Sequence, residues 1–358
     1  MSVARVATAA LWLLLVPGAS ALASAREPVV VSDCVRDGRY VMGTILQVEL
    51  CTTDDRGPLD AADVWAIAER LDALLTTWRA DAPTSRFNAH AGSGLQPLPP
   101  EVIEVLALSR EYSVLTRGTF DVTVGPLVTL WRDAGRRGEL PAADALAAAR
   151  ARVGSEHIVL AQGGSAAALD APGTSVDFGG IGKGYALDRI AGALRARGGT
   201  SALLDFGRSS IQAIGAPPDA DGWRLLLAHP AGASLGVVTL RDRALSVSGS
   251  FGQTSEIAGR RFGHVLDPRT GWPMERDLVA AVVAPTGAAA EALSKALLLL
   301  GERDGIALLE GLDGIEGLLA TADGHTWTTR GWDATVAFEA MPTLEAAQAL
   351  EASRAPAS

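Results

Sequence analysis

The order of the predicted helices and strands constrains the fold of this chain more than any other feature. Amphipathic or alanine-rich helices are predicted over residues 59–78, 101–115 and 141–152. Short strands then dominate residues 153–247, with a single helix over residues 184–197 among them. Because this order lacks the steady strand–helix–strand alternation of a parallel sheet, it predicts an α+β fold with a mixed or antiparallel sheet core and flanking helices.

The C-terminal third fits the same fold class. Residues 278–284 form a continuous apolar run typical of a buried strand, and a helix is predicted over residues 288–300. A closing pair of strands is expected over residues 315–329. We expect one domain over residues 39–340 and a frayed tail at residues 353–358.

Composition excludes several classes of protein. The chain has 358 residues, of which 48% are hydrophobic and 20% charged, so it is globular rather than disordered. Its formal net charge of -10 argues against nucleic acid as the main partner, because phosphate binding needs a basic face. Glycine is abundant, with 39 residues and no collagen-like period. We therefore expect glycine at turns and where the backbone approaches a ligand closely.

The N-terminus has the features of a signal peptide over residues 1–25. One cation, Arg5, precedes an apolar run at residues 7–16, which is shorter than the ~20 residues a membrane span needs. Cleavage is expected after Ala25, with Ala23 as the alternative. The sequence lacks a twin-arginine pair, which favours Sec-type export to the periplasm or the medium. No later segment looks membrane-spanning, and membrane association by other means is left open.

Two cysteines, Cys34 and Cys51, lie in the exported part, at the first predicted strands, which include residues 40–50. In an oxidising compartment the two thiols can pair, or both can stay reduced; the sequence leaves both states open. Two cysteines and five histidines form no CxxC or HExxH motif, so we do not expect a zinc site.

Glycine is densest in the sequence DFGGIGKGY at residues 177–185, between a short strand and a helix. Close-approaching N–H groups, a helix N-terminus and the charge of Lys183 suit an anion. The Walker pattern fails because Gly184 follows Lys183, and the dinucleotide fingerprint fails because Tyr185 replaces its last glycine. The alternative is a structural turn with a solvated lysine.

Two further segments are candidates for a site. His264 stands between two short predicted strands in the sequence GHVLDPRTGWP, where it is either a general base or a structural histidine. Residues 119–127 alternate apolar and polar side chains and end in a Gly-Pro turn. They favour either a strand with polar turn contacts or a flat apolar shelf for a ring system.

Taken in order, six segments resemble the ApbE family of FAD:protein FMN transferases, over residues 39–301. They are MGT at 42–44; TWR at 77–79 with SRFN at 85–88; GTFD at 118–121 with VGPL at 124–127; the glycine loop with Asp188; HVLDPRTGWP at 264–273; and residues 290–301. The resemblance implies an ApbE-like fold and an exported enzyme with FAD as its substrate. Such an enzyme attaches FMN through a phosphoester to a threonine or serine of an acceptor flavoprotein and releases AMP.

The resemblance also assigns roles by position. FAD contacts fall on Met42, Trp78, Thr119, Phe120, Asp121, Asp177, Lys183 and Gly263. His264 corresponds to the base that takes the proton of the acceptor hydroxyl, and Lys183 joins it as a catalytic residue. The family's Mg²⁺ ligands fall on Gly180, Ala288, Glu291 and Lys295.

The sequence departs from the family at the last two of these positions. AEALSKA at residues 290–296 stands where the family has Ala-Asp-Ala-Leu-x-Thr-Ala, so Glu291 replaces an aspartate and Lys295 replaces a threonine. An ammonium cannot ligate a cation. Glu291 and Lys295 lie one helical turn apart and can form an ion pair in the metal site, or Ser294 can be recruited by a small local shift.

These departures leave open whether the protein binds Mg²⁺. They also leave an alternative interpretation of the function, in which the chain binds or hydrolyses FAD and has weak transfer activity. A second departure is Arg208, where the family usually has glycine; its side chain either contacts a phosphate or points to solvent.

Overall fold

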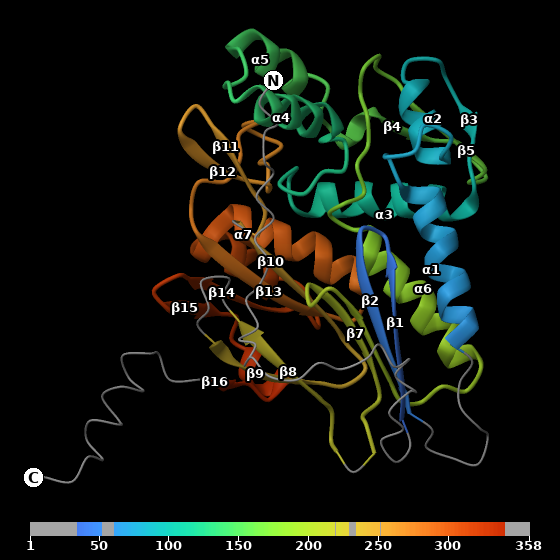
Figure 1. Ribbon diagram of the computed structural model, residues 1–358, viewed down its shortest axis with the longest axis vertical. Helices are drawn as coiled ribbons and strands as arrows, with labels where there is room; N and C mark the ends of the chain where they lie inside the picture. The colour runs from blue at the N-terminus through green and yellow to red at the C-terminus, as the bar shows by residue number, and fades with distance from the viewer. Residues whose placement is uncertain (1–33, 52–60, 219, 229–233, 251, 341–358) are drawn as a thin grey trace, which may run out of the picture.

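The structure is a computed structural model that describes residues 34–51, 61–218, 220–228, 234–250 and 252–340. Its central sheet contains β1 (Cys34–Val41), β2 (Thr44–Cys51), β6 (Ala202–Phe206), β7 (Ser210–Ile214), β10 (Ala244–Gly249), β13 (Leu278–Ala284), β14 (Glu316–Thr321) and β15 (Thr326–Thr328). The strands lie side by side in the order β1-β2-β6-β7-β10-β13-β14-β15, and every neighbouring pair is antiparallel (Figure 1). An antiparallel sheet flanked by helices is the α+β class that the sequence predicts.

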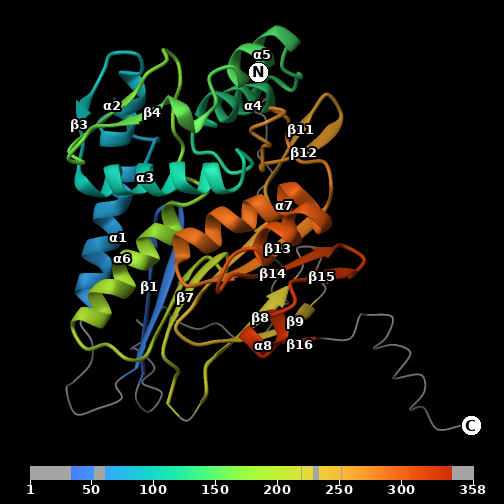
Figure 2. The ribbon, with the colours of Figure 1, turned by 180° about the vertical axis from the view of Figure 1, so that it is seen from behind.

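Three helices lie on this sheet, α1 (Ala61–Leu75), α6 (Gly182–Ala196) and α7 (Gly287–Glu310), and α3 (Pro100–Leu115) completes the helical layer by packing against α1 and α7. α7 packs across β10, β13 and β14, and α6 contacts both α1 and α7 (Figure 2). The apolar spacing that predicts the first helix gives α1 its buried face, which includes Val64, Leu71 and Leu75. The helical layer therefore brings the start of α6 and the start of α7 together over the sheet.

The two faces of β13 explain its unbroken apolar sequence. Ala280 and Val282 belong to the core beneath α7, whereas Ala281 and Val283 belong to a separate core. Alternate side chains of a strand point to opposite faces, so a strand buried on both sides is apolar throughout. The second core is closed by a small sheet of β8 (Trp223–Ala228), β9 (Ser234–Leu240) and β16 (Glu339–Ala340) and by α8 (Trp332–Val336).

The other elements surround the helical layer. They are α2 (Pro83–Ala89), β3 (Gln96–Pro97), α4 (Gly125–Arg137), α5 (Ala143–Arg150), η1 (Ser155–His157), β4 (Ile158–Leu160), β5 (Ala166–Leu169), β11 (Thr254–Ile257) and β12 (Arg260–Gly263). β3, β5 and β4 form a three-stranded sheet, and β11 and β12 form a hairpin.

One local prediction is wrong. Residues 40–50 are not one strand: the chain reverses at Met42 and Gly43, whose φ angles of 51° and 78° fit a tight turn between β1 and β2. Of the two alternatives for residues 119–127 the strand is not found, because Gly125 opens α4 with Pro126 in its first turn. Alternating side chains alone do not reveal either change of direction.

The structure settles the state of the two cysteines but does not describe the two ends of the chain. A disulfide joins Cys34 and Cys51, which face each other across β1 and β2, so of the two states left open the paired one is found. The expected signal peptide at residues 1–25 and the tail at residues 353–358 lie outside the described residues. In the part of the chain that the structure describes, no helix combines the length and apolar character needed to cross a membrane.

Candidate active site

The glycine-rich loop lies where the N-termini of two helices meet. α6 begins at Gly182, and α7 begins at Gly287, one residue after its N-cap Thr286. A Cβ on Gly184 would lie 2.2 Å from the carbonyl oxygen of Gly287, so the helices touch through glycine. This contact brings two helix N-termini to one place. Asp188 and Thr286 already accept the first three N–H groups of α7, so the positive end that favours a phosphate is that of α6.

Four of the residues assigned to FAD border one cavity beside this loop. Met42, Trp78, Asp177 and Lys183 line a cavity of about 200 Å³. Trp78 is 77% exposed, and the guanidinium of Arg132 lies over its indole ring at 4.4 Å from the centroid. The exposed indole offers a flat apolar surface at the cavity mouth.

A larger cavity of about 560 Å³ lies elsewhere, against β1, β2 and β6. Arg36, Asp37 and Glu49 are among its lining residues, and none of the predicted site residues is. We place the site at the smaller cavity because only there do a lysine, a glycine loop and helix N-termini coincide.

Thr119, Phe120 and Asp121 are buried behind the loop. The Phe120 ring lies 3.1 Å from where a Cβ on Gly180 would be, so it supports the loop from below. The Asp121 carboxylate accepts hydrogen bonds from the Ser113 hydroxyl at 2.9 Å and from a backbone N–H two residues onward at 2.8 Å. Among the described residues the Thr119 hydroxyl has no hydrogen-bond partner, although it is buried.

His264 follows β12 and lies within electrostatic reach of both lysines of the site. Its Nδ1 is 3.2 Å from the Gln253 carbonyl oxygen and 3.3 Å from the Gln253 backbone nitrogen. When Nδ1 carries the hydrogen it donates to the carbonyl and the lone pair resides on Nε2; in the other tautomer Nδ1 accepts from the Gln253 N–H. The residue is exposed, but desolvation of its ring, with the charges of Lys295 and Lys183, lowers the pKa of His264. The imidazole is therefore neutral near pH 7, as a general base must be. Gly263 precedes it, and a Cβ there would meet a facing carbonyl at 2.1 Å.

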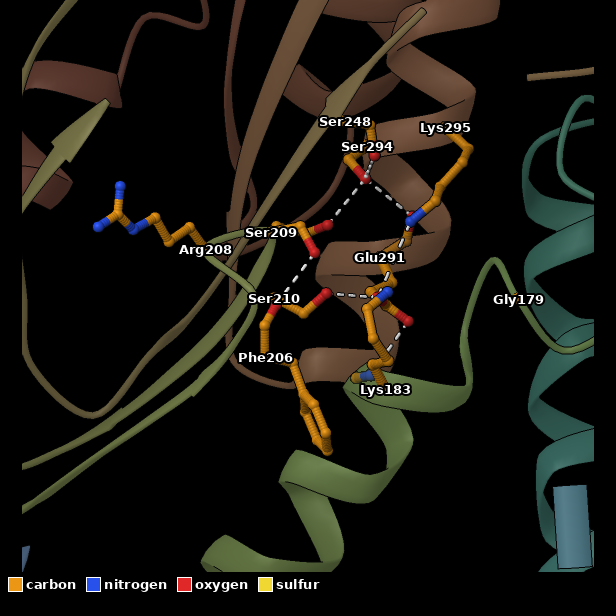
Figure 3. A network of polar contacts seen from close by, with 12 residues as sticks. Gly179, Lys183, Phe206, Arg208, Ser209, Ser210, Ser248, Glu291, Ser294 and Lys295 are labelled. Atoms are coloured by element: carbon orange, nitrogen blue, oxygen red, sulfur yellow. Dashed lines mark hydrogen bonds and ion pairs between the residues drawn. The ribbon is translucent and has the colours of Figure 1, made fainter. Parts of the chain in front are cut away.

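Both carboxylate oxygens of Glu291 are engaged (Figure 3). Oε1 accepts hydrogen bonds from Lys183 Nζ at 2.7 Å and from Ser210 Oγ at 2.5 Å, and Oε2 accepts the Gly184 N–H at 3.0 Å. Lys295, one turn along α7, has its Nζ 4.0 Å from the same Oε1. Burial by itself would raise the pKa of Glu291, but the two ammoniums outweigh it and lower the pKa to about 2. The carboxylate is ionised and binds two cations.

Ser294 and Arg208 take no part in this cluster. The Ser294 hydroxyl donates to the Glu291 carbonyl oxygen at 2.9 Å and lies 3.1 Å and 2.8 Å from the hydroxyls of Ser246 and Ser248 on β10. The Ser294 hydroxyl is therefore not recruited to the Glu291 carboxylate. Arg208 is exposed, and its side chain points away from Glu291 (Figure 3).

The residues at the family's metal positions do not fit Mg²⁺. Mg²⁺ requires near-octahedral oxygen ligands at about 2.0–2.1 Å. Lys295 offers only N–H donors there, and burial lowers the pKa of its ammonium to about 8 against the pull of Glu291, so it is charged at pH 7. A dication bound there would also be repelled by the charge of the Lys295 ammonium.

Two residues that support the site were not assigned roles from the sequence. Ser210, the first residue of β7, holds the Glu291 carboxylate, and no local motif marks it. Asp188 of α6 accepts the N–H groups of Gly287 and Ala288 at 2.6 Å and 2.9 Å, so it fixes the start of α7. Burial raises the pKa of Asp188 to about 6. The sequence named Asp188 only as part of the family-like glycine segment, one turn after the loop, without a role.

Comparisons with known proteins agree on one family. The ApbE family model matches residues 42–319. An FAD:protein FMN transferase of Klebsiella pneumoniae is 33% identical over 276 residues, which is 75% of this chain and 78% of that relative. One from Escherichia coli K12 is 29% identical over 72% of this chain and 75% of the relative. The crystal structure of the Pseudomonas stutzeri flavinyl transferase ApbE in its apo form is 30% identical, with a TM-score of 0.74 over 86% of this chain and 98% of that one.

Proposed function

This chain belongs to the ApbE family and is a flavin transferase, and from that premise we propose that it is an exported enzyme that moves FMN from FAD to a partner protein. FMN is attached through a phosphoester to a threonine or serine hydroxyl of an acceptor flavoprotein, and AMP leaves. The observation that carries this proposal is the cluster of two helix N-termini, a glycine loop and Lys183 beside a cavity bordered by an exposed indole. A pyrophosphate and a flavin ring are the two parts of FAD that such a site suits.

The reaction requires positioning, charge neutralisation and a base. The acceptor hydroxyl oxygen attacks the phosphorus of the FMN half, and its proton passes to Nε2 of His264. The bond from that phosphorus to the bridging oxygen breaks, and AMP leaves with the electron pair on this oxygen. The glycine loop and Lys183 hold the pyrophosphate, because N–H donors and an ammonium neutralise the charge that builds on the leaving phosphate.

Transfer is tested with the purified mature protein, FAD and a purified flavoprotein domain known to carry threonine-linked FMN. We expect covalent flavin fluorescence on the acceptor in a denaturing gel and release of AMP in equal amount. The matched acceptor with alanine in place of its threonine should stay unlabelled. AMP released at the same rate without acceptor would instead identify an FAD hydrolase, and retention of FAD with neither product would identify a binding protein.

His264 is tested as the base by His264→Ala, with His325→Ala as the control. His325 lies beyond the site, at the turn before β15, where its ring packs edge-on against Trp327. Loss of a general base costs about 10²–10⁴-fold in rate. We expect that loss for His264→Ala with FAD affinity retained, and wild-type transfer for His325→Ala. Equal rates in both variants would remove His264 from the reaction.

Export is supported by two features. The first 25 residues have the composition of a cleavable signal, and a disulfide joins Cys34 to Cys51. Such bonds persist in oxidising compartments. Cell fractionation with N-terminal sequencing tests this: we expect an exported product that begins at Arg26, or at Ser24 if the alternative cleavage site is used. A product that retains residues 1–25 in the cytoplasm would refute export.

A further inference from the structure

The sequence has 31 lysine and arginine residues, of which only Lys183 and Lys295 are lysines. Both lysines form an ion pair with the same carboxylate, that of Glu291, although 112 positions separate them along the chain. Lysine carries a compact point charge, whereas arginine spreads its charge over a planar fork. The chain therefore uses a compact cation at two places only, and both belong to the site.

Lys295 keeps donors that Glu291 does not use. Its Nζ lies 4.0 Å from Oε1, beyond hydrogen-bond distance, because Lys183 and Ser210 already hydrogen-bond that oxygen. The Lys295 side chain is 21% exposed, so its ammonium is neither sealed in the core nor free in solvent. An ammonium has three N–H donors. Among the residues that the structure describes, no hydrogen bond from this ammonium is found, so its donors are available to a ligand that enters the site.

The charge of the cluster suits a phosphate. Lys183 and Lys295 contribute two positive charges against the one negative charge of Glu291. A second carboxylate, Asp188, lies at the start of α7, where it is held by two backbone N–H groups. An ammonium whose N–H groups contact a phosphate neutralises charge on the leaving oxygen, as a bridging metal ion does at other phosphoryl-transfer sites.

We propose that the Lys295 ammonium takes the place of the divalent cation in this chain, contacts the pyrophosphate of FAD, and makes flavin transfer independent of Mg²⁺. The proposal rests on the proposed transfer function. In the transfer step the P–O bond to AMP breaks and its oxygen keeps the electron pair. Lys183 and Lys295 stabilise that oxygen by hydrogen bonds and charge, and the proton of the acceptor hydroxyl passes to His264 as before.

The first test uses the unaltered protein. After EDTA treatment and gel filtration, transfer of FMN from FAD to the threonine-bearing acceptor should stay within about twofold of the rate in added Mg²⁺. Mn²⁺ binding is followed separately by electron paramagnetic resonance in the presence of FAD, which reads the metal site without any turnover. We expect no protein-bound Mn²⁺ signal. Transfer abolished by EDTA and restored by Mg²⁺, or stoichiometric Mn²⁺ binding, would overturn the inference and leave the transferase function intact.

The second test restores the family residue. Lys295→Thr should lose at least tenfold in transfer without metal, regain it with Mg²⁺, and bind Mn²⁺ in the resonance assay. Arg208→Ala is the matched control, because it removes a neighbouring cation whose side chain points away from the cluster. It should match the wild type in both assays. Lys295→Thr with undiminished metal-free transfer would overturn the inference, whereas absence of transfer in every protein, with FAD bound, would refute the transferase function itself.

Discussion

Glu291→Gln is the perturbation that most directly tests the charge cluster. The Glu291 side chain has no exposed surface, and its two oxygens accept hydrogen bonds from Lys183, Ser210 and the Gly184 N–H. Glutamine keeps the size and one acceptor oxygen. Its NH₂ group, however, would meet either the Gly184 N–H or the Lys183 ammonium, donor against donor. The substitution also leaves two ammoniums without their counter-ion.

The magnitude follows from the pKa. The pKa of Glu291 is about 2, against an ordinary value of 4.5. One pKa unit corresponds to about 1.4 kcal/mol, so the ionised carboxylate contributes about 3 kcal/mol to the free energy of unfolding at pH 7. Breaking a buried ion pair by removing one partner typically costs about 3–5 kcal/mol, which agrees in size. We expect Glu291→Gln to lower the free energy of unfolding by about 3 kcal/mol.

Urea unfolding followed by circular dichroism measures this difference. The folded-state pKa of Glu291 is depressed, so its contribution is fully present above pH 4.5 and is lost as the pH falls toward 2. The difference in unfolding free energy between wild type and variant should therefore narrow below pH 4.5. Between pH 8 and pH 5 it should widen as the pH falls, because Lys295, whose pKa is about 8 with Glu291 in place, loses its counter-ion in the variant and its pKa falls further. Adding Lys295→Met to Glu291→Gln should recover about 1 kcal/mol or more, because it removes one of the stranded charges.

The control is Glu275→Gln, which breaks an exposed ion pair with Arg260. Exposed pairs contribute about 0–1 kcal/mol, so this variant should unfold almost like the wild type. A Glu291→Gln protein that also lies within about 1 kcal/mol of the wild type would refute the reasoning. In that case the buried carboxylate would not be the ionised partner of both lysines.

Three further outcomes follow from the geometry. Gly184→Ala should destabilise the protein by about 1–3 kcal/mol in urea unfolding, because its Cβ would lie 2.2 Å from a carbonyl oxygen of the facing helix. The control is Gly192→Ala on the same helix, where a Cβ would meet nothing within 4 Å; it should be neutral or stabilising, and equal effects of the two substitutions would contradict the packing argument. Removing the disulfide by Cys34→Ser should cost about 3 kcal/mol, and a reducing agent should cost the wild type the same and the variant nothing. The lowered pKa of His264 should move the acid limb of kcat/KM below the ordinary histidine value of about 6.5, and a limb above it would contradict His264 as the base.

Local patterns determine part of the fold. The apolar run at residues 278–284 coincides with β13, and the amphipathic spacing at residues 59–78 contains α1. The hairpin turn at Met42 and the start of α4 at Gly125 were not predicted. Both depend on backbone direction, which hydrophobic periodicity does not encode, and Gly125 is needed because a Cβ there would meet Ser175 at 2.3 Å.

The sequence by itself determined the candidate residues of the site and the substitution of lysine for threonine at position 295. No single motif could show that Lys183 and Ser210 donate to the same oxygen of Glu291, since the three residues come from α6, β7 and α7. The tertiary structure decided that the acid at the metal position forms ion pairs with two ammoniums. The physical reason is that charge and hydrogen-bond capacity are set by what folding brings within about 3 Å, and residues distant in the chain meet only when the helices pack on the sheet.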